Sequence, residues 1–317
     1  MTYLVTGGAG FVGSHVAESL LKRGERVIAI DNFNDYYDPA VKEANALKLQ
    51  DYDHFTLVRG DIRDAALLKD LFREHQFSHI AHMAAMAGVR ASATQVPLYM
   101  DVNLTGTMNL LENARDTNSA QFVFASTSSV YGKTEVLPFV ETDTANRPLA
   151  AYPASKRAGE LLGHSYHNLN KMNFTALRFF NVYGPAGRPD MMPMRLMHGA
   201  VDGTQMKLFN GGDIHRDWTY IDDITEGVIA ALDRPLGYEV INLGFGAPIS
   251  LSDFVEIVEE LSGHEINKVS VETPLTEPPI TYCNNNKARE LLGFNPHTPV
   301  QDGLRKTWEW FVNHYNL

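Results

Sequence analysis

Short apolar runs alternate with amphipathic segments along the first 180 residues of the chain. The apolar runs end at small or polar residues, which is typical of buried parallel strands. The segments between them repeat apolar residues three and four positions apart, which indicates helices. The predicted strands are residues 3–6, 27–30, 55–58, 79–82, 122–125 and 174–180, and the predicted helices are residues 11–23, 64–75, 97–116 and 152–170. This alternation predicts an α/β fold with a Rossmann-type, doubly wound parallel sheet.

The pattern becomes less regular after residue 180. Residues 181–191 are rich in turn formers, and the helices and strands that follow are shorter and less evenly spaced. The helices are predicted at residues 192–202, 222–232, 252–261 and 303–314, and the strands at residues 206–209 and 239–243. We therefore expect residues 1–180 to form a cofactor-binding domain and residues 181–317 a smaller α/β lobe that binds substrate, with some elements crossing between them. No internal repeat or long linker separates the two, so we expect them to pack tightly.

A glycine-rich turn, from Gly7 to Gly13, lies between the first strand and the first helix. Glycines let the backbone approach a pyrophosphate, and the start of a helix offers free N–H groups and the positive end of a dipole. A glycine-rich tract can also be a simple tight turn. The strand before it and the helix after it favour a dinucleotide site.

The second predicted strand ends at Asp31. An acidic residue about twenty positions beyond the glycines accepts hydrogen bonds from the adenosine ribose and repels a 2′-phosphate, which favours NAD over NADP. The alternative interpretation is that Asp31 only forms a turn before Asn32. After the strand at residues 79–82, the small residues that follow Met83 would let a flat cofactor ring lie close to the backbone.

Two polar motifs supply candidate chemistry. The hydroxyl run from Ser126 to Ser129 falls at the C-terminal end of the strand at residues 122–125, where open α/β sheets bind ligands. Tyr152 and Lys156 are four residues apart, so a helix places them on one face. An ammonium beside a phenol lowers a pKa that is about 10 in the free residue. Tyr152 is therefore a candidate proton acceptor, although the same spacing also occurs in exposed helix pairs.

Composition excludes several other classes of function. A net charge of -11 argues against broad binding to nucleic acid or to anionic membranes. The single cysteine, Cys283, excludes an internal disulfide and is interpreted as a small apolar filler. His15 and His82 lack metal-ligand partners at suitable spacing, so we predict no metal site. No signal-peptide pattern and no apolar run long enough to cross a bilayer are present, and we expect a cytoplasmic protein.

Together these motifs resemble the extended short-chain dehydrogenase/reductase family. The glycine fingerprint, Thr127 with Tyr152 and Lys156, and the segment at residues 181–185 occur in the family's order over nearly the whole chain. Within the family the chain is most similar to the UDP-glucuronate 4-epimerases. The segments that carry this closer similarity are residues 31–39, 87–90, 187–191 and 216–223.

The resemblance implies a reaction. Tyr152, assisted by Lys156 and Thr127, takes the proton from the 4-hydroxyl of the sugar while the C4 hydride moves to tightly held NAD. The resulting 4-keto sugar rotates, and the hydride returns to its opposite face. UDP-glucuronate and UDP-galacturonate are thereby interconverted.

The resemblance also implies which residues contact each ligand. Asn181, Arg188 and Arg216 are expected near the diphosphate and Glu277 near the uridine ribose, although each arginine could instead form a surface or interlobe ion pair. The expected NAD contacts are Gly7, Gly10, Phe11, Val12, Gly13, Asp31, Asn32, Asp61, Ile62, Met83, Ala84, Ala85, Asn103, Tyr152 and Lys156. The expected UDP-sugar contacts are Arg90, Thr127, Ser128, Ser129, Tyr152, Asn181, Arg188, Lys207, Phe209, Arg216 and Glu277.

The hydroxyl run bears on the fate of the intermediate. A uronic acid oxidised at C4 is a β-keto acid, and such acids lose carbon dioxide readily. The resemblance implies Glu in related decarboxylases where this chain has Ser129, and Asp-Glu in related 4,6-dehydratases where this chain has Ser128 and Ser129. Both differences favour an epimerase. Our hypothesis is that Thr127, Ser128 and Ser129 hold the carboxylate so that the C5–C6 bond is not aligned with the carbonyl π system.

Alternatives within and outside this reaction class stay open. A UDP-glucose/galactose 4-epimerase, a UDP-glucuronate decarboxylase and a nucleotide sensor without chemistry share most of the motifs. The helices at residues 97–116 and 152–170 resemble the pair that relatives use for a four-helix dimer bundle, so we expect a homodimer. A monomer whose own loops shield those helices is the alternative.

Overall fold

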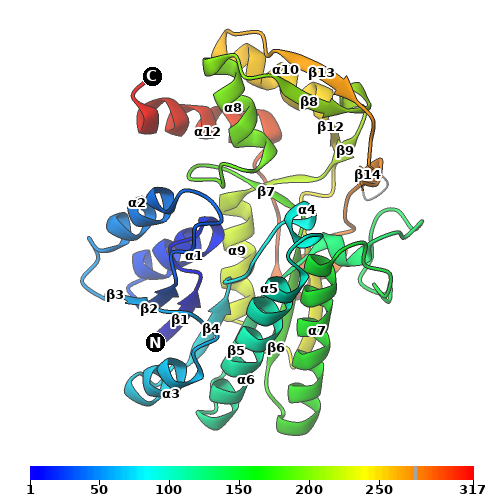
Figure 1. Cartoon of the computed structure of the whole chain (residues 1–317). Helices are drawn as coiled ribbons and strands as arrows, with labels where there is room; N and C mark the ends of the chain where they lie inside the picture. The colour runs from blue at the N-terminus through cyan, green and yellow to red at the C-terminus, as the bar shows by residue number, and fades with distance from the viewer. Residues whose placement is uncertain (275–276) are drawn as a thin grey trace.

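A computed structural model describes residues 1–274 and 277–317 of the chain. Its centre is a seven-stranded parallel sheet in the order β11-β6-β5-β4-β1-β2-β3 (Figure 1). These strands are β1 (Thr2–Thr6), β2 (Arg26–Asp31), β3 (Phe55–Arg59), β4 (His79–His82), β5 (Gln121–Thr127), β6 (Phe174–Phe179) and β11 (Tyr238–Leu243). The order reverses beside β1, which confirms the predicted doubly wound topology and places a topological switch point between β1 and β4.

The sheet is buried on both faces because successive strand residues point to opposite sides. Tyr3 and Val5 of β1 belong to one hydrophobic cluster, whereas Leu4 between them belongs to another. The first cluster includes residues of α1 (Phe11–Lys22), α9 (Ile221–Leu232) and α11 (Asn286–Leu292). The second includes residues of α3 (Ala65–Glu74) and α6 (Gly106–Asp116) and is flanked by α7 (Ala151–Asn170). Two helical layers therefore enclose the sheet.

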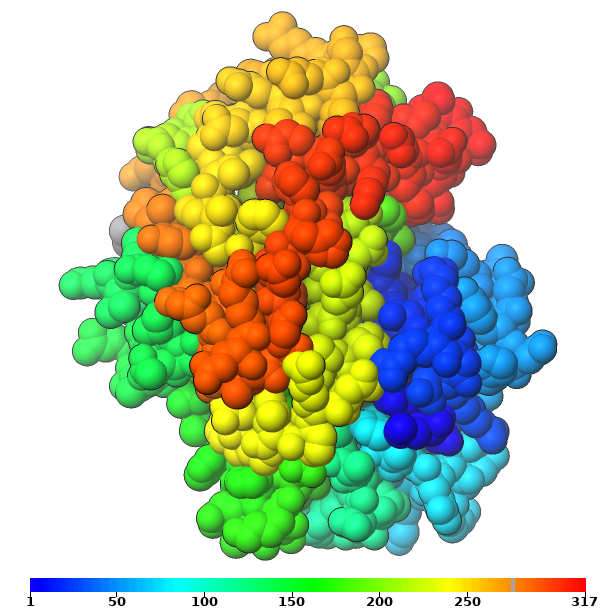
Figure 2. Space-filling view, turned by 180° about the vertical axis from the view of Figure 1, so that it is seen from behind, coloured from blue at the N-terminus to red at the C-terminus, as the bar shows by residue number. Residues whose placement is uncertain are grey.

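A second lobe lies above the C-terminal edge of the sheet in Figure 1. Its core joins α8 (Met192–Asp202), α10 (Leu251–Ser262) and α12 (Val300–Tyr315). Three small sheets support it: β12-β9-β14, β13-β8 and β10-β7. Their strands are β7 (Asn181–Tyr183), β8 (Met206–Phe209), β9 (His215–Arg216), β10 (Trp218–Tyr220), β12 (Ile249–Ser250), β13 (Lys268–Val271) and β14 (Ile280–Thr281). The view from behind shows the yellow-to-red part of the chain extending from the second lobe down over the middle of the first, beside the blue N-terminal part (Figure 2).

The predicted helix at residues 97–116 is present and helical throughout, but it is not α-helical along its whole length. It consists of α5 (Val96–Met100), a π-helical turn (Asp101–Thr105) and α6. The Thr107 hydroxyl donates to the Asn103 carbonyl at 2.6 Å, and the Asn103 side chain bonds both backbone groups of Met86. A π-helical turn of this kind is usually a single turn inside an α-helix, and apolar periodicity does not distinguish it from the turns around it.

Two further features differ from the sequence-based prediction. α2 (Pro39–Leu49) follows the predicted loop and was not anticipated, because it buries only Lys42, Ala46 and Leu49. Asp38 caps it by accepting from the Ala40 N–H at 2.9 Å. The predicted strand at residues 239–243 is β11, which extends the main sheet beside β6. Among the described residues, no helix is both long enough and apolar enough to span a membrane.

Candidate active site

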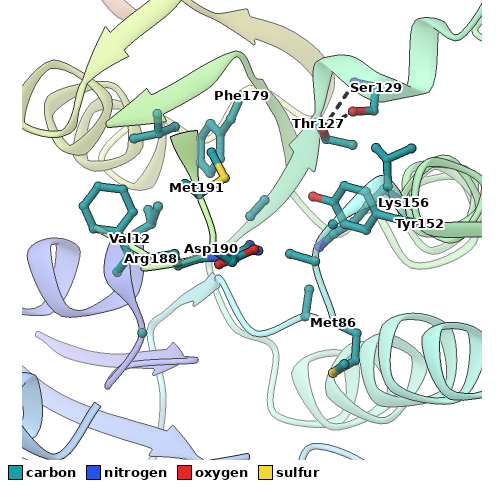
Figure 3. A pocket seen from close by; sticks show the side chains of 18 of the residues that line it. Val12, Met86, Thr127, Ser129, Tyr152, Lys156, Phe179, Arg188, Asp190 and Met191 are labelled. Atoms are coloured by element: carbon teal, nitrogen blue, oxygen red, sulfur yellow. Dashed lines mark hydrogen bonds and ion pairs between the residues drawn. The ribbon is translucent and has the colours of Figure 1, made fainter. Parts of the chain in front are cut away.

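A cavity of about 560 Å³ lies between the C-terminal edge of the main sheet and the second lobe. It runs from the glycine-rich turn after β1 to residues of the second lobe such as Arg216 and Glu277. Figure 3 shows Thr127, Tyr152 and Lys156 on one side of it, with Arg188 and Asp190 on another. The cavity therefore connects the predicted cofactor residues, the predicted catalytic residues and the predicted substrate residues in one continuous space.

The glycine-rich turn is closed by contacts that only glycine permits. Gly7 has a φ of +66°, and its N–H donates to the carbonyl of Ile30 at 2.8 Å. A Cβ on Gly13 would lie 2.0 Å from the Gly7 carbonyl oxygen, so the start of α1 packs directly on the turn. Gly10 precedes α1, and no side chain caps the first turn of the helix. Free N–H groups thus remain at a helix start beside the cavity, as a pyrophosphate requires.

Asp31 marks the far end of this part of the cavity. Its side chain is 8% exposed and accepts from the N–H groups of Ala9 at 3.2 Å and Phe33 at 2.9 Å. The next residue, Asn32, donates to Asp61 at 2.8 Å, which brings two predicted cofactor residues together. Hydrogen bonding by Arg63 is the largest cause of the low pKa of Asp61, which is about 2. The glycine cradle and the carboxylate of Asp31 together fit the diphosphate and the adenosine ribose of a dinucleotide.

A buried polar chain holds the loop that follows β4. The ring of His82 contacts the hydroxyls of Thr6 at 2.7 Å and Thr107 at 2.9 Å. Thr6 also accepts from the N–H of Ala84 at 3.1 Å, and Ala84 lines the cavity. Burial holds the pKa of His82 well below its usual value, so the ring is neutral. These contacts fix a predicted cofactor-binding loop from beneath.

The three predicted catalytic residues come from the end of β5 and the start of α7. α7 begins at Ala151, so Tyr152 and Lys156 lie on one helix face as predicted. Thr127 is the last residue of β5 and is 8% exposed. Lys156 is 3% exposed, and its ammonium lies 4.7 Å from the ring centre of Phe124. Both members of the pair line the cavity, which rules out the alternative of an exposed helix pair.

The ionisation of Tyr152 differs from the sequence-based prediction. The sequence predicts that Lys156 lowers the pKa of Tyr152. In the structure, burial raises the pKa of Tyr152, while the Thr127 hydroxyl and the charge of Arg188 lower it. Burial also lowers the pKa of Lys156 to about 7, so much of its charge is lost near neutral pH. The prediction of a net decrease is therefore wrong for the protein alone, because residue spacing does not report burial.

The hydroxyl run forms its own hydrogen bonds at the end of β5. The Thr127 side chain accepts from the Ser129 N–H at 3.2 Å and donates to the Ser129 hydroxyl at 3.3 Å (Figure 3). Ser128 and Ser129 begin a 3₁₀ turn (Ser128–Tyr131), and both line the cavity. Several hydroxyls can therefore face one ligand at this point.

The arginines of the second lobe form ion pairs at the other end of the cavity. Arg216 is 8% exposed and donates to Glu277 at 3.0 Å. Glu277 also accepts from Arg90 at 3.2 Å, and Arg90 lies 4.9 Å from the ring centre of Phe209. Burial lowers the pKa of Arg216, and the charge of Glu277 opposes that change. Predicted phosphate and ribose residues thus contact one another directly.

Arg188 forms a second ion pair. It donates to the two oxygens of Asp190 at 3.0 Å and 2.6 Å, and it lies 5.3 Å from the ring centre of Tyr36. Arg188 and Asp190 both line the cavity. In the described structure each predicted arginine is therefore both a cavity residue and a member of an ion pair.

Most residues predicted from the sequence line this cavity, and two do not. Asn103 lies behind it, donating to the Ser155 hydroxyl at 2.9 Å and supporting Met86. Lys207 is an exposed residue of β8. The predicted residues that line the cavity are Gly7, Gly10, Phe11, Val12, Gly13, Asp31, Asn32, Asp61, Ile62, Met83, Ala84, Ala85, Arg90, Thr127, Ser128, Ser129, Tyr152, Lys156, Asn181, Arg188, Phe209, Arg216 and Glu277.

The structure adds cavity residues that the sequence did not identify. Tyr36, Tyr37 and Lys42 come from the segment after β2, and Arg195 comes from α8. Lys42 is 4% exposed and donates to the carbonyl and side-chain oxygens of Asn34. No local motif marks these residues, because they reach the cavity through the path of a loop and the packing of α8.

Comparison with known proteins agrees with this geometry. The profile of the family described as GDP-mannose 4,6 dehydratase matches residues 4–307. The chain belongs to this family. The resemblance to extended short-chain dehydrogenases/reductases is thereby confirmed. Ser128 and Ser129 nevertheless stand where the resemblance places the Asp-Glu pair of the dehydratases.

Individual relatives share the full length of the chain. The UDP-glucuronate 4-epimerase of Thermodesulfobacterium geofontis is 41% identical over 316 residues, covering 99% of this chain and 97% of the relative. A solved UDP-glucuronic acid 4-epimerase from Bacillus cereus, in complex with UDP-glucuronic acid and NAD, is 34% identical with a TM-score of 0.93, covering 99% of this chain and 100% of that one. A UDP-glucose 4-epimerase from Thermotoga maritima, solved with UDP-glucose, is 27% identical with a TM-score of 0.92 over 99% and 100% of the two chains.

Proposed function

We propose that the protein is an NAD-dependent UDP-glucuronate 4-epimerase that interconverts UDP-glucuronate and UDP-galacturonate. The observation that carries the proposal is the continuity of the cavity. Tyr152, Lys156 and the hydroxyls of Thr127, Ser128 and Ser129 lie between the glycine cradle and the arginines of the second lobe. A sugar joined to a diphosphate at Arg216 would therefore extend toward the Tyr152 hydroxyl. The names of the relatives support the same substrate.

The roles of the residues follow from this placement. NAD, when bound, supplies a hydride acceptor at C4 and the hydride donor for the return step. Tyr152 Oη takes the proton from the 4-hydroxyl and returns it to the same oxygen, O4, after the 4-keto sugar has turned to present the opposite face of C4. Thr127 favours the phenolate by hydrogen bonding, and the charge of Arg188 acts in the same direction. Lys156 adds its own positive charge in the fraction of the protein in which it is protonated. A cavity of this size falls within the range of about 300–1,000 Å³ typical of ligand sites.

The hydroxyls at the end of β5 are proposed to bind the sugar carboxylate. Hydrogen bonds from Ser128 and Ser129, joined by Thr127 when its one hydroxyl proton is not donated to Tyr152, would hold the carboxylate away from the position in which carbon dioxide leaves. A glutamate at residue 129 would repel that carboxylate, because two like charges in contact are destabilising. The serines therefore favour epimerisation over decarboxylation and an acidic sugar over a neutral one.

The second candidate is a UDP-glucose 4-epimerase. The T. maritima enzyme of that name has nearly the same backbone, with a TM-score of 0.92. Hydroxyl side chains at the end of β5 can also bind the 6-hydroxyl of a neutral sugar. The choice therefore depends on the carboxylate contact.

A product assay by NMR tests the proposal. Purified protein supplied with UDP-glucuronate should form UDP-galacturonate, and the rate with UDP-glucose should be much lower. Tyr152→Phe should reduce the epimerisation rate by about 10²- to 10⁴-fold, the usual contribution of a general acid–base group. Conversion of UDP-glucose alone would favour the second candidate, and an unchanged rate in Tyr152→Phe would reject the catalytic assignment.

Three further proposals concern organisation. We propose the division predicted from the sequence, with residues 1–180 binding NAD and residues 181–317 binding the UDP-sugar, while α9 and β11 return to the main sheet. We propose a homodimer formed by α6 and α7, because both carry exposed apolar side chains, including Met108 and Leu161. We also propose a cytoplasmic location, which suits a chain with one buried, unpaired cysteine.

A further inference from the structure

Asp217 lies where the chain passes from one small sheet to another. β9, just before it, belongs to the sheet β12-β9-β14, whereas β10, just after it, pairs with β7. The Asp217 side chain is 1% exposed and does not line the cavity. A buried carboxylate needs hydrogen-bond donors for both oxygens, because an unpaired buried charge is costly.

Three backbone N–H groups supply those hydrogen bonds. Phe245 donates to Oδ1 at 2.9 Å, and Gly246 and Cys283 donate to Oδ2 at 3.0 Å and 3.1 Å. Phe245 and Gly246 follow β11 at the edge of the main sheet, and Cys283 follows β14. A single side chain therefore connects the main sheet to a sheet of the second lobe. A Cβ on Gly244 would lie 2.9 Å from the same carboxylate, so the segments are closely packed around it.

The backbone groups of Asp217 form hydrogen bonds to two further segments of the chain. Its N–H donates to the Thr281 carbonyl at 3.0 Å, and its carbonyl accepts from the Asn181 N–H at 3.1 Å. Thr281 and Asn181 both line the cavity, as does Arg216, the residue immediately before Asp217. Three cavity residues from three separate parts of the chain are thus fixed relative to one buried residue.

We propose that Asp217 is a positioning residue for nucleotide-sugar binding: it holds Arg216, Asn181 and Thr281 together without contacting the ligand. The inference rests on the proposed function, in which this part of the cavity receives the UDP group. The residues of the chemical step, Tyr152 and Lys156, are carried by a different element, α7. Loss of Asp217 should therefore weaken ligand binding much more than it slows the conversion of bound substrate.

Asp217→Asn is the informative substitution because it preserves size. An amide has one acceptor oxygen, whereas the carboxylate uses both of its oxygens here. In either orientation the amide nitrogen would face at least one backbone N–H group, which forces those segments apart. The KM for UDP-glucuronate and the Kd for UDP should rise by about tenfold or more, the size expected when a hydrogen bond to a charged group is lost. We expect kcat to stay within about threefold of wild type.

Asp223→Asn is a matched control. Asp223 of α9 is fully buried, and its two oxygens also accept backbone N–H groups, from His297 and Thr298, each at 3.2 Å. Asp223 does not line the cavity. Both variants should lose thermal stability, but only Asp217→Asn should raise KM and Kd. Equal KM values in the two variants would overturn the inference, because the role of Asp217 would then be stability alone.

A milder pair of variants covers the case in which Asp217→Asn does not fold. Gly246 has a φ of +83°, so Gly246→Ala strains the turn that presents one of the three N–H groups. Gly263→Ala introduces similar strain at a φ of +71°, at a position with no neighbour within 4 Å. A rise in KM for Gly246→Ala alone supports the inference, and no difference between the two rejects it. If wild type binds UDP but leaves UDP-glucuronate unchanged, the proposed substrate fails while the UDP titration still tests Asp217.

Discussion

Glu160 lies one helical turn beyond Lys156 on α7 and is the negative charge that supports the charged form of that lysine. Burial lowers the pKa of Lys156 to about 7, and Glu160 opposes that decrease. Glu160 itself is fully buried and accepts from Ser126 at 2.5 Å and from Arg178 at 2.8 Å and 2.9 Å. It does not line the cavity. The charge on a catalytic candidate therefore depends on a residue that never reaches the ligand.

Glu160→Gln should move the pH profile of kcat. Without the nearby negative charge, the pKa of Lys156 falls further, so the lysine loses its proton at lower pH. The other groups near Lys156 do not replace that charge: His82 on β4 is neutral and Thr127 on β5 is uncharged. The alkaline limb of the profile should shift to lower pH, measured by epimerisation rate across a pH series.

The same substitution leaves Arg178 without its buried partner, which should cost about 3–5 kcal/mol of unfolding free energy. Calorimetry therefore identifies a temperature at which the variant is fully folded, and the pH profile is measured at that temperature. Glu43→Gln is the control, because Glu43 pairs with Arg59 at an exposed position on α2 and should leave the profile unchanged. An unmoved alkaline limb in folded Glu160→Gln would contradict this account of Lys156.

Lys156 should also reduce stability in a pH-dependent way. Its pKa is about 7 in the folded protein, against 10.5 for an unperturbed lysine. Between these values the unfolded chain binds more protons, so the lysine makes the free energy of unfolding rise with pH across that window. Lys156→Met removes the contribution. The variant should be more stable than wild type at and below neutral pH, and its advantage should shrink toward pH 10.5.

Urea unfolding at about pH 6.5 and about pH 9.5 measures this difference. Lys48→Met, at a position exposed on α2, controls for the loss of a lysine. An advantage of Lys156→Met that does not shrink between the two pH values would show that burial does not lower the pKa of Lys156. The epimerisation rate of the same variant should fall. Lys156 would then be a residue that lowers the stability of the wild-type protein but supports its activity.

The elements with strong periodicity could be predicted, and those set by tertiary contacts could not. Each strand and helix predicted before residue 180 corresponds to an element of the structure, because the sheet is buried on both faces. α2 was missed because its buried surface is small. The contact between Asn103 of the π-helical turn and Met86 joins separate segments of the chain, and local pattern does not report such a contact. For the same reason the pairing of β11 with β6 could not be foreseen.

The candidate site shows the same division. Residues in local motifs, such as Gly13 and Tyr152, could be identified because spacing alone places them. Tyr36 and Arg195 could not, because they reach the cavity only through the path of a loop and the packing of α8. The direction of the Tyr152 pKa was wrong for a related reason: spacing identifies a neighbouring cation, whereas burial is a property of the whole fold.

Ser129→Ala should increase decarboxylation of the intermediate. If the Ser129 hydroxyl donates to the substrate carboxylate, its loss removes a hydrogen bond to a charged group, worth about 1.5–3 kcal/mol. The share of turnovers that release carbon dioxide should then rise by about tenfold or more. NMR detection of UDP-4-keto-pentose measures that share. Ser262→Ala, at the end of α10 and away from the cavity, is the control. If Ser129→Ala releases no more UDP-4-keto-pentose than wild type does, Ser129 does not have this role.

Leu161→Glu should separate the proposed dimer. Leu161 and Leu169 are 55% and 74% exposed and lie on one face of α7, and Met108 of the neighbouring α6 is 42% exposed. Burying such side chains against a second copy contributes about 25 cal/mol per Å² of apolar area, and a buried glutamate would oppose association. Sedimentation at micromolar concentration should give the dimer mass for wild type and the monomer mass for Leu161→Glu. Leu47→Glu, at a 68% exposed position on α2, should stay dimeric, and a monomeric wild type would reject the bundle.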